Sequence, residues 1–597
     1  MPQCRQRLEK YYRKKPPAAM QRRQPPSRTA SHSSSSIREE RKNRRTARAG
    51  THGRDQGAGA TNPLVGFFIG LIVITSAVLV LGLGVTVGVI GSNYYSDRRK
   101  ASALRRFAAE NAVTTPTNNV FPPPFPVVSA HSTTTSLSKE VLDMCANTLW
   151  HTLKTTTIVL PNDESFIHTG DIDDLWLRDS AGQVHPLLLP WFPGGALVAQ
   201  DARLARVVSG LIRRSAFYIR HDPYANAFRI DTSYVFNEEQ KRMGRHEFIS
   251  TWNYELDSGC YFIRMLYFYW KAIPDAPVLR EKSVFEAVSI MVDLWAAEQD
   301  HENDVYPQGE LFDCQNCKGP YRYPGLQRGG KGRYTKRTGM TWTGFRPSDD
   351  ECQFNYLVPA NMMAATSLGF ATELAQTIWA EFGGNALAAK ASKLASEIDQ
   401  GIKEFGIVEH ETYGRIYAYE VDGSGNSLLM DDANIPSLLS APYLGYKGLD
   451  EEVYANTKRF IYSKDNPTYQ SGTNVLTGKL DGYGSPHMRT AIWTNIWPMA
   501  MAMRGLVSND VEEKVTIINQ LQKASAGSGW MHESFDVNNP KKFTRPWFCW
   551  SDALFAELVM SVSDQCPGNE QYTIRWWRDP ELPDGGKYAG RQTISKA

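Results

Sequence analysis

The sequence predicts an all-α body, a toroid of helices with an active face built from long loops. Helical periodicity recurs after residue 138, where apolar residues lie three or four apart along one stripe. Loops rich in Gly, Pro, aromatic and polar residues separate these stretches. Strand-like alternation is rare, and its best case, GRIYAYEVDG at 414–423, predicts one hairpin. Residues 131–597 would hold about a dozen helix-plus-loop units, at about 11–12 residues per helix.

The chain begins with a basic segment. Residues 1–60 contain 16 Lys and Arg against four acids, a balance of +12, whereas the whole chain carries +3, so the remainder carries −9. Because this segment has almost no Val, Leu or Ile, it cannot bury enough apolar surface to offset the entropy of ordering, and residues 1–63 are predicted to be a disordered cytosolic tail. The acidic remainder argues against nucleic acid as a partner, since phosphate binding depends on clustered Lys and Arg.

Residues 64–90, LVGFFIGLIVITSAVLVLGLGVTVGVI, contain no charged residue. About 20 apolar residues span a bilayer, so this segment is predicted to be a transmembrane helix that contacts lipid. About sixty polar residues precede it, which is typical of an uncleaved signal anchor rather than a signal peptide.

Basic residues flank this helix at close range on both sides, so the positive-inside rule gives a weak preference. We expect a type II protein of the secretory pathway (Golgi or endoplasmic reticulum), with its tail in the cytosol and its body in the lumen. Residues 91–130 are predicted to be a stem rich in Pro and Thr that holds the body, residues 131–597, off the membrane.

Several stretches of the body predict amphipathic helices. In SKEVLDMCANTLWHTLKTT, the apolar side chains Val141, Cys145, Leu149 and Leu153 lie four apart on one stripe. The others are LARVVSGLIRRSAFYIR, SVFEAVSIMVDLWAAEQ, the Ala-rich ATELAQTIWAEFGGNALAAKASKLASEIDQGIKEF, and NDVEEKVTIINQLQKA.

Motifs for nucleotide, zinc-protease, calcium-loop or serine-hydrolase chemistry are missing from the sequence. Gly329-Gly330-Lys331 lacks the spacing of a phosphate loop, and MHESF at 531–535 lacks a second His at zinc-protease spacing. Cys314-x2-Cys317 has no second pair at zinc-finger spacing; a small disulfide-bonded loop is its alternative role. We therefore expect neither a metal nor a cofactor.

With those motifs missing, the chemical feature left in the sequence is a set of carboxylates next to aromatic residues. GDIDDLWLRDSAGQ, residues 170–183, holds four aspartates and one arginine around Trp176. Locally this stretch could equally be a capped helix start, with Asp173 or Asp174 as N-cap and Arg178 paired to a neighbour. Six tryptophans beside polar motifs favour a saccharide groove instead, because cleavage of a glycosidic bond requires two carboxyl groups. They are Trp176, Trp342, Trp493, Trp530, Trp547 and Trp550.

Five blocks of the body resemble glycoside hydrolase family 125, whose members are exo-acting α-1,6-mannosidases. They are GDIDDLWLRDS, GMTWTGFRPSDDE, YLVPANMMA, GYGSPHMRTAIWTNIWPMA and GWMHESFDVNNPKKFTRPWFCWSDALF. The blocks occur in the family's order over most of residues 140–575. The resemblance implies an (α/α)6 barrel, inversion of the anomeric configuration, no metal, and an α-mannoside oligosaccharide or glycan as substrate.

The resemblance also implies roles for individual residues. The general acid would be Asp349, or its neighbour Asp350, and the general base Glu533. Trp176, Arg178 and Asp179 are similar to a turn that grips the non-reducing sugar in glucoamylase-like barrels, with Arg178 keeping the nearby carboxylates ionised. Other residues would contact the sugar or support those that do. They are Asp173, Asp174, Arg346, Asn361, His487, His532 and Arg545.

Two other functions fit the same blocks. One is an inverting α-glycosidase for another linkage or sugar. The other is a catalytically silent, membrane-anchored protein that binds mannan; the presence of both Asp349 and Glu533 argues against it.

Overall fold

A computed structural model of the chain describes residues 136–192, 194–242, 245–302, 326–488, 494–566 and 575–576. The predicted tail (1–63), membrane helix (64–90) and stem (91–130), and the pair Cys314 and Cys317, lie outside these residues. Among the helices of the described ranges, none is both long and apolar enough to span a bilayer.

The periodic stretches form the expected helices, which we call the outer helices. They are α3 (Lys139–His151), α6 (Ala202–His221), α9 (Lys282–Ala297), α12 (Gly384–Phe405) and α16 (Val511–Ala524). Three of them begin at side chains that accept hydrogen bonds from the first turn, Ser138, Asp201 and Asp510. A further amphipathic helix, α14 (Glu451–Ile461), begins in the same way at Asp450.

A second set, the inner helices, is mostly buried. They are α4 (Leu177–Leu188), α8 (Leu256–Ala272), α11 (Val358–Thr377), α15 (Pro498–Leu506) and α17 (Cys549–Met560). Every residue of α4 and α17 is buried. A helix without a solvent face has no polar stripe, so periodicity could not reveal most of this set.

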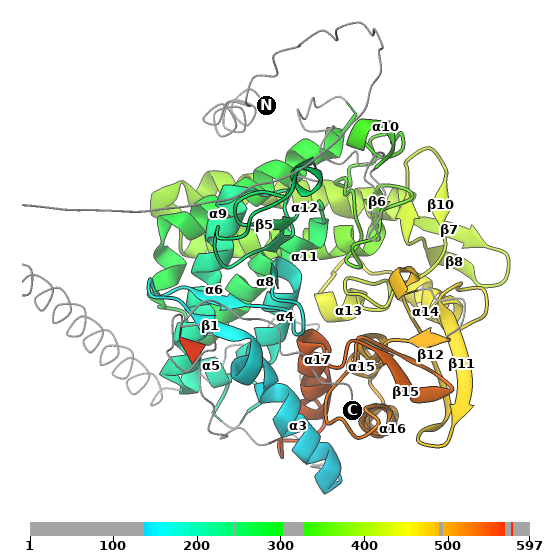
Figure 1. Ribbon diagram of the computed structural model, residues 1–597. Coiled ribbons are helices and arrows are strands. Elements are labelled where there is room, and N and C mark those ends of the chain that lie inside the picture. Colours follow the sequence, from blue (N-terminus) through cyan, green and yellow to red (C-terminus); the bar gives the residue numbers. More distant parts are fainter. Residues whose placement is uncertain are drawn as a thin grey trace, which may run out of the picture. The chain divides into compact units, whose positions relative to one another are not determined.

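The two sets pack as layers (Figure 1). In the inner layer, α4 contacts α8 and α17, α8 contacts α11, and α15 contacts α17. In the outer layer, α3 packs on α17, α12 on α11, and α16 on α15. The result is a helical barrel. The remaining short helices are α5 (Leu197–Gln200), α7 (Glu238–Arg242), α10 (Gln327–Gly330) and α13 (Ala441–Leu444).

The Ala-rich stretch forms two helices rather than one. Between α11 and α12 the chain turns at Gly383, whose φ of 88° is left-handed and suits glycine. At Gly384 a Cβ atom would lie 2.1 Å from the carbonyl oxygen of Ala375, so the close approach of the two helices requires glycine there as well.

Short strands in the connections make the all-α expectation wrong for this part of the fold. The stretch predicted as a hairpin, residues 414–423, is divided: β8 (Gly414–Tyr417) forms a hairpin with the preceding β7 (Ile407–His410), and residues 420–421 join another sheet. Buried loop backbones need hydrogen-bond partners, and they obtain them by pairing in small sheets. Three of these sheets carry site residues. The first consists of β3 (Leu175–Trp176), β4 (Ala227–Phe228) and β5 (Ile249–Thr251), and the second of β6 (Tyr356–Leu357), β9 (Glu420–Val421) and β10 (Ser427–Leu428). The third consists of β13 (Asn495–Ile496), β14 (Ser534–Asp536) and β15 (Asn539–Thr544). The other strands are β1 (Thr157–Val159), β2 (Ser165–Ile167), β11 (Tyr469–Asn474), β12 (Gly478–Tyr483) and β16 (Arg575–Trp576).

A disulfide joins the two ends of the described body. It links Cys145 in α3 to Cys566, which follows α17. Because these cysteines are 421 residues apart, the bond closes a very long loop and restricts the unfolded chain.

Candidate active site

The predicted acid pair lies on a tight turn. The backbone N–H of Arg346 donates to the carbonyl of Asp350 (2.8 Å), and the N–H of Asp349 donates back to the carbonyl of Arg346 (2.9 Å). Asp349 adopts a left-handed φ of 64°, which is uncommon for a residue other than glycine. Such backbone strain is found most often at functional sites.

Asp349 receives two hydrogen bonds on the same oxygen. The indole N–H of Trp176 donates to Oδ1 (3.3 Å), and the amide Nδ2 of Asn226 donates to it as well (3.1 Å). The guanidinium of Arg178 lies 4.0 Å from that oxygen. The side chain of Asp349 remains 23% exposed, so it is held in place while still open to a ligand.

The β3–β4–β5 sheet brings these donors together. Trp176 in β3 pairs with Ala227 in β4, directly after Asn226. The amide oxygen of Asn226 accepts hydrogen bonds from the Thr251 hydroxyl (2.7 Å) and the Asn253 backbone N–H (3.2 Å). Its Nδ2 must therefore point the other way, where it donates to Asp349 and to Glu255 (2.9 Å).

Arg178 is buried and faces several carboxylates. Its NH1 donates to Glu255 (2.6 Å) and Asp257 (3.1 Å), and its Nε lies 3.4 Å from Asp179. Burial raises the pKa of both Glu255 and Asp257, and Arg178 opposes that rise. The positive charge of Arg178 thus offsets part of the negative charge of these three carboxyl groups, which lie close to Asp349.

Two expectations for residues 170–183 need correction. Helix α4 begins at Leu177, with Trp176 as an N-cap that makes no side-chain hydrogen bond, so neither Asp173 nor Asp174 caps it. Arg178 does lower the pKa of Asp179, but burial outweighs this effect and raises the pKa to about 6.

The other two aspartates of this segment differ in environment. Asp173 is half-buried. Asp174 is buried, accepts a hydrogen bond from Ser250 and lies 3.5 Å from Arg229. Burial raises its pKa, even though Arg229 and Ser250 favour the charged form.

Asp350 is engaged on both of its oxygens. Ser348 donates to Oδ2 (3.2 Å), and Nδ1 of His487 lies 3.4 Å from Oδ1. The hydrogen bond to Asp350, together with the charges of Asp350, Asp349 and Glu533, raises the pKa of His487 to about 9 against the opposing effect of burial. The imidazole of His487 therefore favours its charged form and interacts electrostatically with both aspartates of the turn and with Glu533.

Glu533 precedes β14 and is held from β15 and the loop that follows it. The Thr544 hydroxyl donates to Oε2 (3.1 Å), and NH1 of Arg545 lies 3.5 Å from Oε1. Nε of Arg545 also donates to Asp171 (2.6 Å), which ties Glu533 to the 170–183 segment. The Glu533 side chain is 11% exposed.

Three other predicted residues are bound to protein groups. Arg346 is buried and donates to Glu420 (2.5 Å). Asn361 exchanges hydrogen bonds with the backbone of Thr341 (2.8 and 3.1 Å). His532 stacks on Phe543 with ring centroids 3.7 Å apart. These three residues support the loops of the site from behind.

The tryptophans that the sequence assigned to a saccharide groove differ in burial. Trp342 is fully buried against His301, and Trp550 is 2% exposed, so the groove expectation is wrong for these two core residues. Trp530 and Trp547 are half-buried. Trp493 lies outside the described residues.

Sequence reasoning missed several polar residues of the site. Asn226 has no motif around it, whereas Glu255 and Asp257 lie in TWNYELDSG, which shows the same acidic-aromatic signal used elsewhere. Glu351 follows the acid pair; burial and then the charge of Asp350 raise its pKa to about 7, against Arg346.

A family model described as "Metal-independent alpha-mannosidase (GH125)" matches residues 138–560. The chain belongs to glycoside hydrolase family 125. It is therefore a glycoside hydrolase, and its helical barrel is the fold expected of this family.

Relatives in family 125 extend the match. The chain is 34% identical over 434 residues to the Meiotically up-regulated gene 157 protein of Schizosaccharomyces pombe, covering 70% of this chain and 81% of that protein. Its fold matches a metal-independent α-mannosidase of Streptococcus pneumoniae, solved in a non-productive complex with α-1,6-mannobiose. That match has a TM-score of 0.61 and 35% identity and covers 71% of this chain and 94% of the other.

Proposed function

We propose that this protein is an inverting, exo-acting α-1,6-mannosidase on an (α/α)6 barrel, which releases mannose from the non-reducing end of an α-mannoside oligosaccharide or glycan. The observation that carries the proposal is the placement of His487, whose charge responds to Asp349, Asp350 and Glu533 together. Carboxyl groups from both signature blocks are thus close enough to one imidazole to interact with its charge, and Asp350 lies 3.4 Å from it, which supports a two-carboxylate hydrolysis. The α-1,6-mannobiose bound by the Streptococcus pneumoniae relative supports the linkage.

Asp349 acts as the general acid. Its two hydrogen bonds from Trp176 and Asn226 both end on Oδ1, so Oδ2 is the oxygen that carries a proton to the glycosidic oxygen. Asp350 is the weaker candidate because Ser348 and His487 occupy both of its oxygens. It would instead hold a sugar hydroxyl, directly or through His487.

Glu533 acts as the general base. It takes a proton from a water molecule that attacks the anomeric carbon on the face opposite the leaving group. Thr544 and Arg545 orient the carboxylate, and Asp171 in turn orients Arg545. In each turnover Asp349 gives one proton to the leaving oxygen and Glu533 takes one proton from water, so the number of protons on the enzyme stays the same.

Time-resolved proton NMR of α-1,6-mannobiose with the full-length protein tests the proposal. We expect β-mannose to appear before mutarotation produces the α-anomer. If α-mannose appears first, the enzyme is retaining and Glu533 is not a base. Parallel assays on α-1,2- and α-1,3-mannobiose and on isomaltose separate the α-1,6-mannosidase from a glycosidase of another linkage or sugar. Absence of turnover on all of them would favour a mannan-binding protein.

We also propose that the protein is a single-pass type II protein of the secretory pathway, anchored in the bilayer by residues 64–90 with its body lumenal. The Cys145–Cys566 disulfide supports this topology, because such bonds persist in oxidising compartments. In sealed microsomes the body should resist added protease until detergent is present. Digestion of the body without detergent would contradict the topology.

A further inference from the structure

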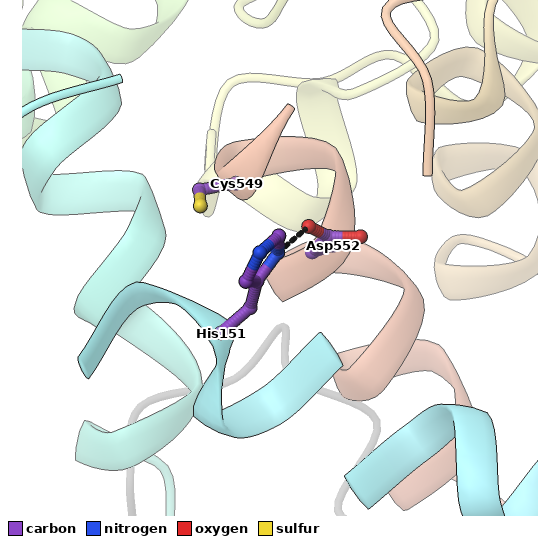
Figure 2. A group of neighbouring side chains, drawn as sticks. All are labelled: His151, Cys549 and Asp552. Carbon is purple, nitrogen blue, oxygen red and sulfur yellow. Dashed lines mark hydrogen bonds and ion pairs between the residues drawn. The ribbon is translucent and has the colours of Figure 1, made fainter. Parts of the chain in front are cut away.

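A cluster of three donor side chains lies between α3 and α17 (Figure 2). His151 ends α3, and Cys549 and Asp552 lie three residues apart in the first turn of α17. One nitrogen, one sulfur and one oxygen of these residues lie within 4.8 Å of one another. The exposed fractions are 3% for His151 and 0% for Cys549 and Asp552, so all three donors are buried.

The donor set suits zinc better than magnesium or calcium. Imidazole, thiolate and carboxylate are the ligands of Zn²⁺, whereas Mg²⁺ and Ca²⁺ select oxygen alone. With three protein ligands, a water molecule would take the fourth position of a tetrahedral zinc. Residues three apart on a helix share a face, so α17 presents two ligands toward the third on α3.

We propose that His151, Cys549 and Asp552 bind one Zn²⁺ ion that links the first and last helices of the described body. Binding forms Zn–N, Zn–S and Zn–O bonds. The thiol proton of Cys549 and the proton between His151 and Asp552 are released to the solvent. No electron is transferred.

Only a small movement is needed to admit the ion. Nδ1 of His151 and Oδ2 of Asp552 are 2.7 Å apart. Two ligands about 2.0–2.1 Å from a tetrahedral zinc are roughly 3.4 Å apart, so this pair must open by about 0.7 Å. Rotation of the two side chains supplies a movement of that size.

Two partly exposed indoles cover the imidazole of His151. Trp530 stacks on His151 at 3.7 Å between ring centroids, and Trp547 lies at 4.7 Å. Both indoles are half-buried. Trp530 follows a turn in which Ala526, Gly527 and Gly529 have positive φ values.

The site also touches the segment that leads to the proposed base. Oδ1 of Asp552 accepts a hydrogen bond from the backbone N–H of Met531 (2.7 Å), two residues before Glu533. A bound ion would fix Asp552 and hence the start of this segment. The family is described as metal-independent, and the proposed ion supports the fold without entering the reaction.

The test uses full-length protein that has been stripped with a chelator and dialysed. Titration with Zn²⁺ by calorimetry should show one ion per chain, and Co²⁺ in its place should give the absorption of a cobalt–thiolate bond. Cys549→Ser should abolish that absorption and weaken zinc binding at least tenfold. Cys260→Ser, a buried thiol on α8, is the matched control and should bind like the wild type.

Two results would overturn the proposal: wild-type protein that shows neither stoichiometric zinc binding nor the cobalt–thiolate absorption, or equal losses in the Cys549 and Cys260 variants. Because wild-type protein without the cobalt–thiolate absorption overturns the proposal by itself, the test keeps a decisive outcome even if the Cys549 variant fails to fold. No readout requires substrate, so the outcome is independent of the proposed mannosidase activity.

Discussion

Asn226 donates a 3.1 Å hydrogen bond to Asp349, across 123 residues of sequence. Thr251 and Asn253 hold the amide oxygen of Asn226, which fixes the direction of its N–H groups. The residue that orients the proposed acid is therefore itself oriented by the neighbouring strand.

Replacing Asn226 should impair chemistry more than binding. In Asn226→Ala, Asp349 loses a donor that holds Oδ1, and hydrogen bonds to charged groups contribute about 1.5–3 kcal/mol. We expect kcat on α-1,6-mannobiose to fall roughly ten- to hundredfold with little change in KM. Asn426→Ala, which removes an amide bonded to Asp422 in the turn between β9 and β10, should leave kcat unchanged, because that amide bonds Asp422 and not Asp349. Equal losses in both variants would show that the effect is not specific to the acid.

The choice between the two neighbouring acids can be decided by leaving groups. Asp349→Asn removes the proton donor, so hydrolysis of α-1,6-mannobiose should collapse while an aryl mannoside with a good leaving group is spared. Asp350→Asn should slow both substrates to a similar degree, because it loses a binding contact. The reverse pattern would identify Asp350 as the acid.

The role of Glu533 can be separated from its structural contacts. Glu533→Gln keeps the shape and still accepts from Thr544, but the amide cannot take a proton from water. Turnover should fall by at least a thousandfold, while calorimetry should still detect binding of α-1,6-mannobiose. Recovery of activity with azide, giving β-mannosyl azide, would identify the missing function as the base. A variant that neither binds nor melts cooperatively would show instead that Glu533 holds the fold.

Asp179 should make stability depend on pH. Its folded-state pKa of about 6 lies above the ordinary 3.8, so the folded protein prefers the protonated form. The wild type therefore loses stability as the pH rises from about 4 to 6, by roughly 3 kcal/mol at 1.36 kcal/mol per pKa unit. Asp179→Asn lacks this cost and should melt higher than wild type at pH 7, with the difference shrinking toward pH 4.

The same Asp179→Asn variant should be nearly inactive, because the neutral amide offers sugar hydroxyls one accepting oxygen where the carboxylate offers two charged ones. If it instead melts below the wild type at pH 7, attraction between Asp179 and Arg178 outweighs the burial cost. Thermal melts at several pH values, together with kcat on α-1,6-mannobiose, check both expectations.

Local pattern was sufficient for the outer helices. In α3 and α16, the polar face meets solvent and the apolar face meets the core, so the periodicity of the sequence shows which residues are buried. The strand at 414–417 was visible because polar and apolar residues alternate in the stretch GRIYAYEVDG. The inner helices gave no such signal because α4 and α17 are buried on every side.

By itself, the sequence determined the barrel family, the two blocks that hold Asp349 and Glu533, and the outer helices, because these depend on residue types within a short span. Only the tertiary structure decided that Asn226 and Trp176 share one oxygen of Asp349, and that His151 meets Cys549 and Asp552. It also decided that the pKa of Asp179 is raised, because the effect of burial outweighs that of the positive charge on Arg178, its neighbour in sequence. Distances across hundreds of residues and the loss of solvent around a carboxylate are set by how helices and sheets pack, and no local pattern records them.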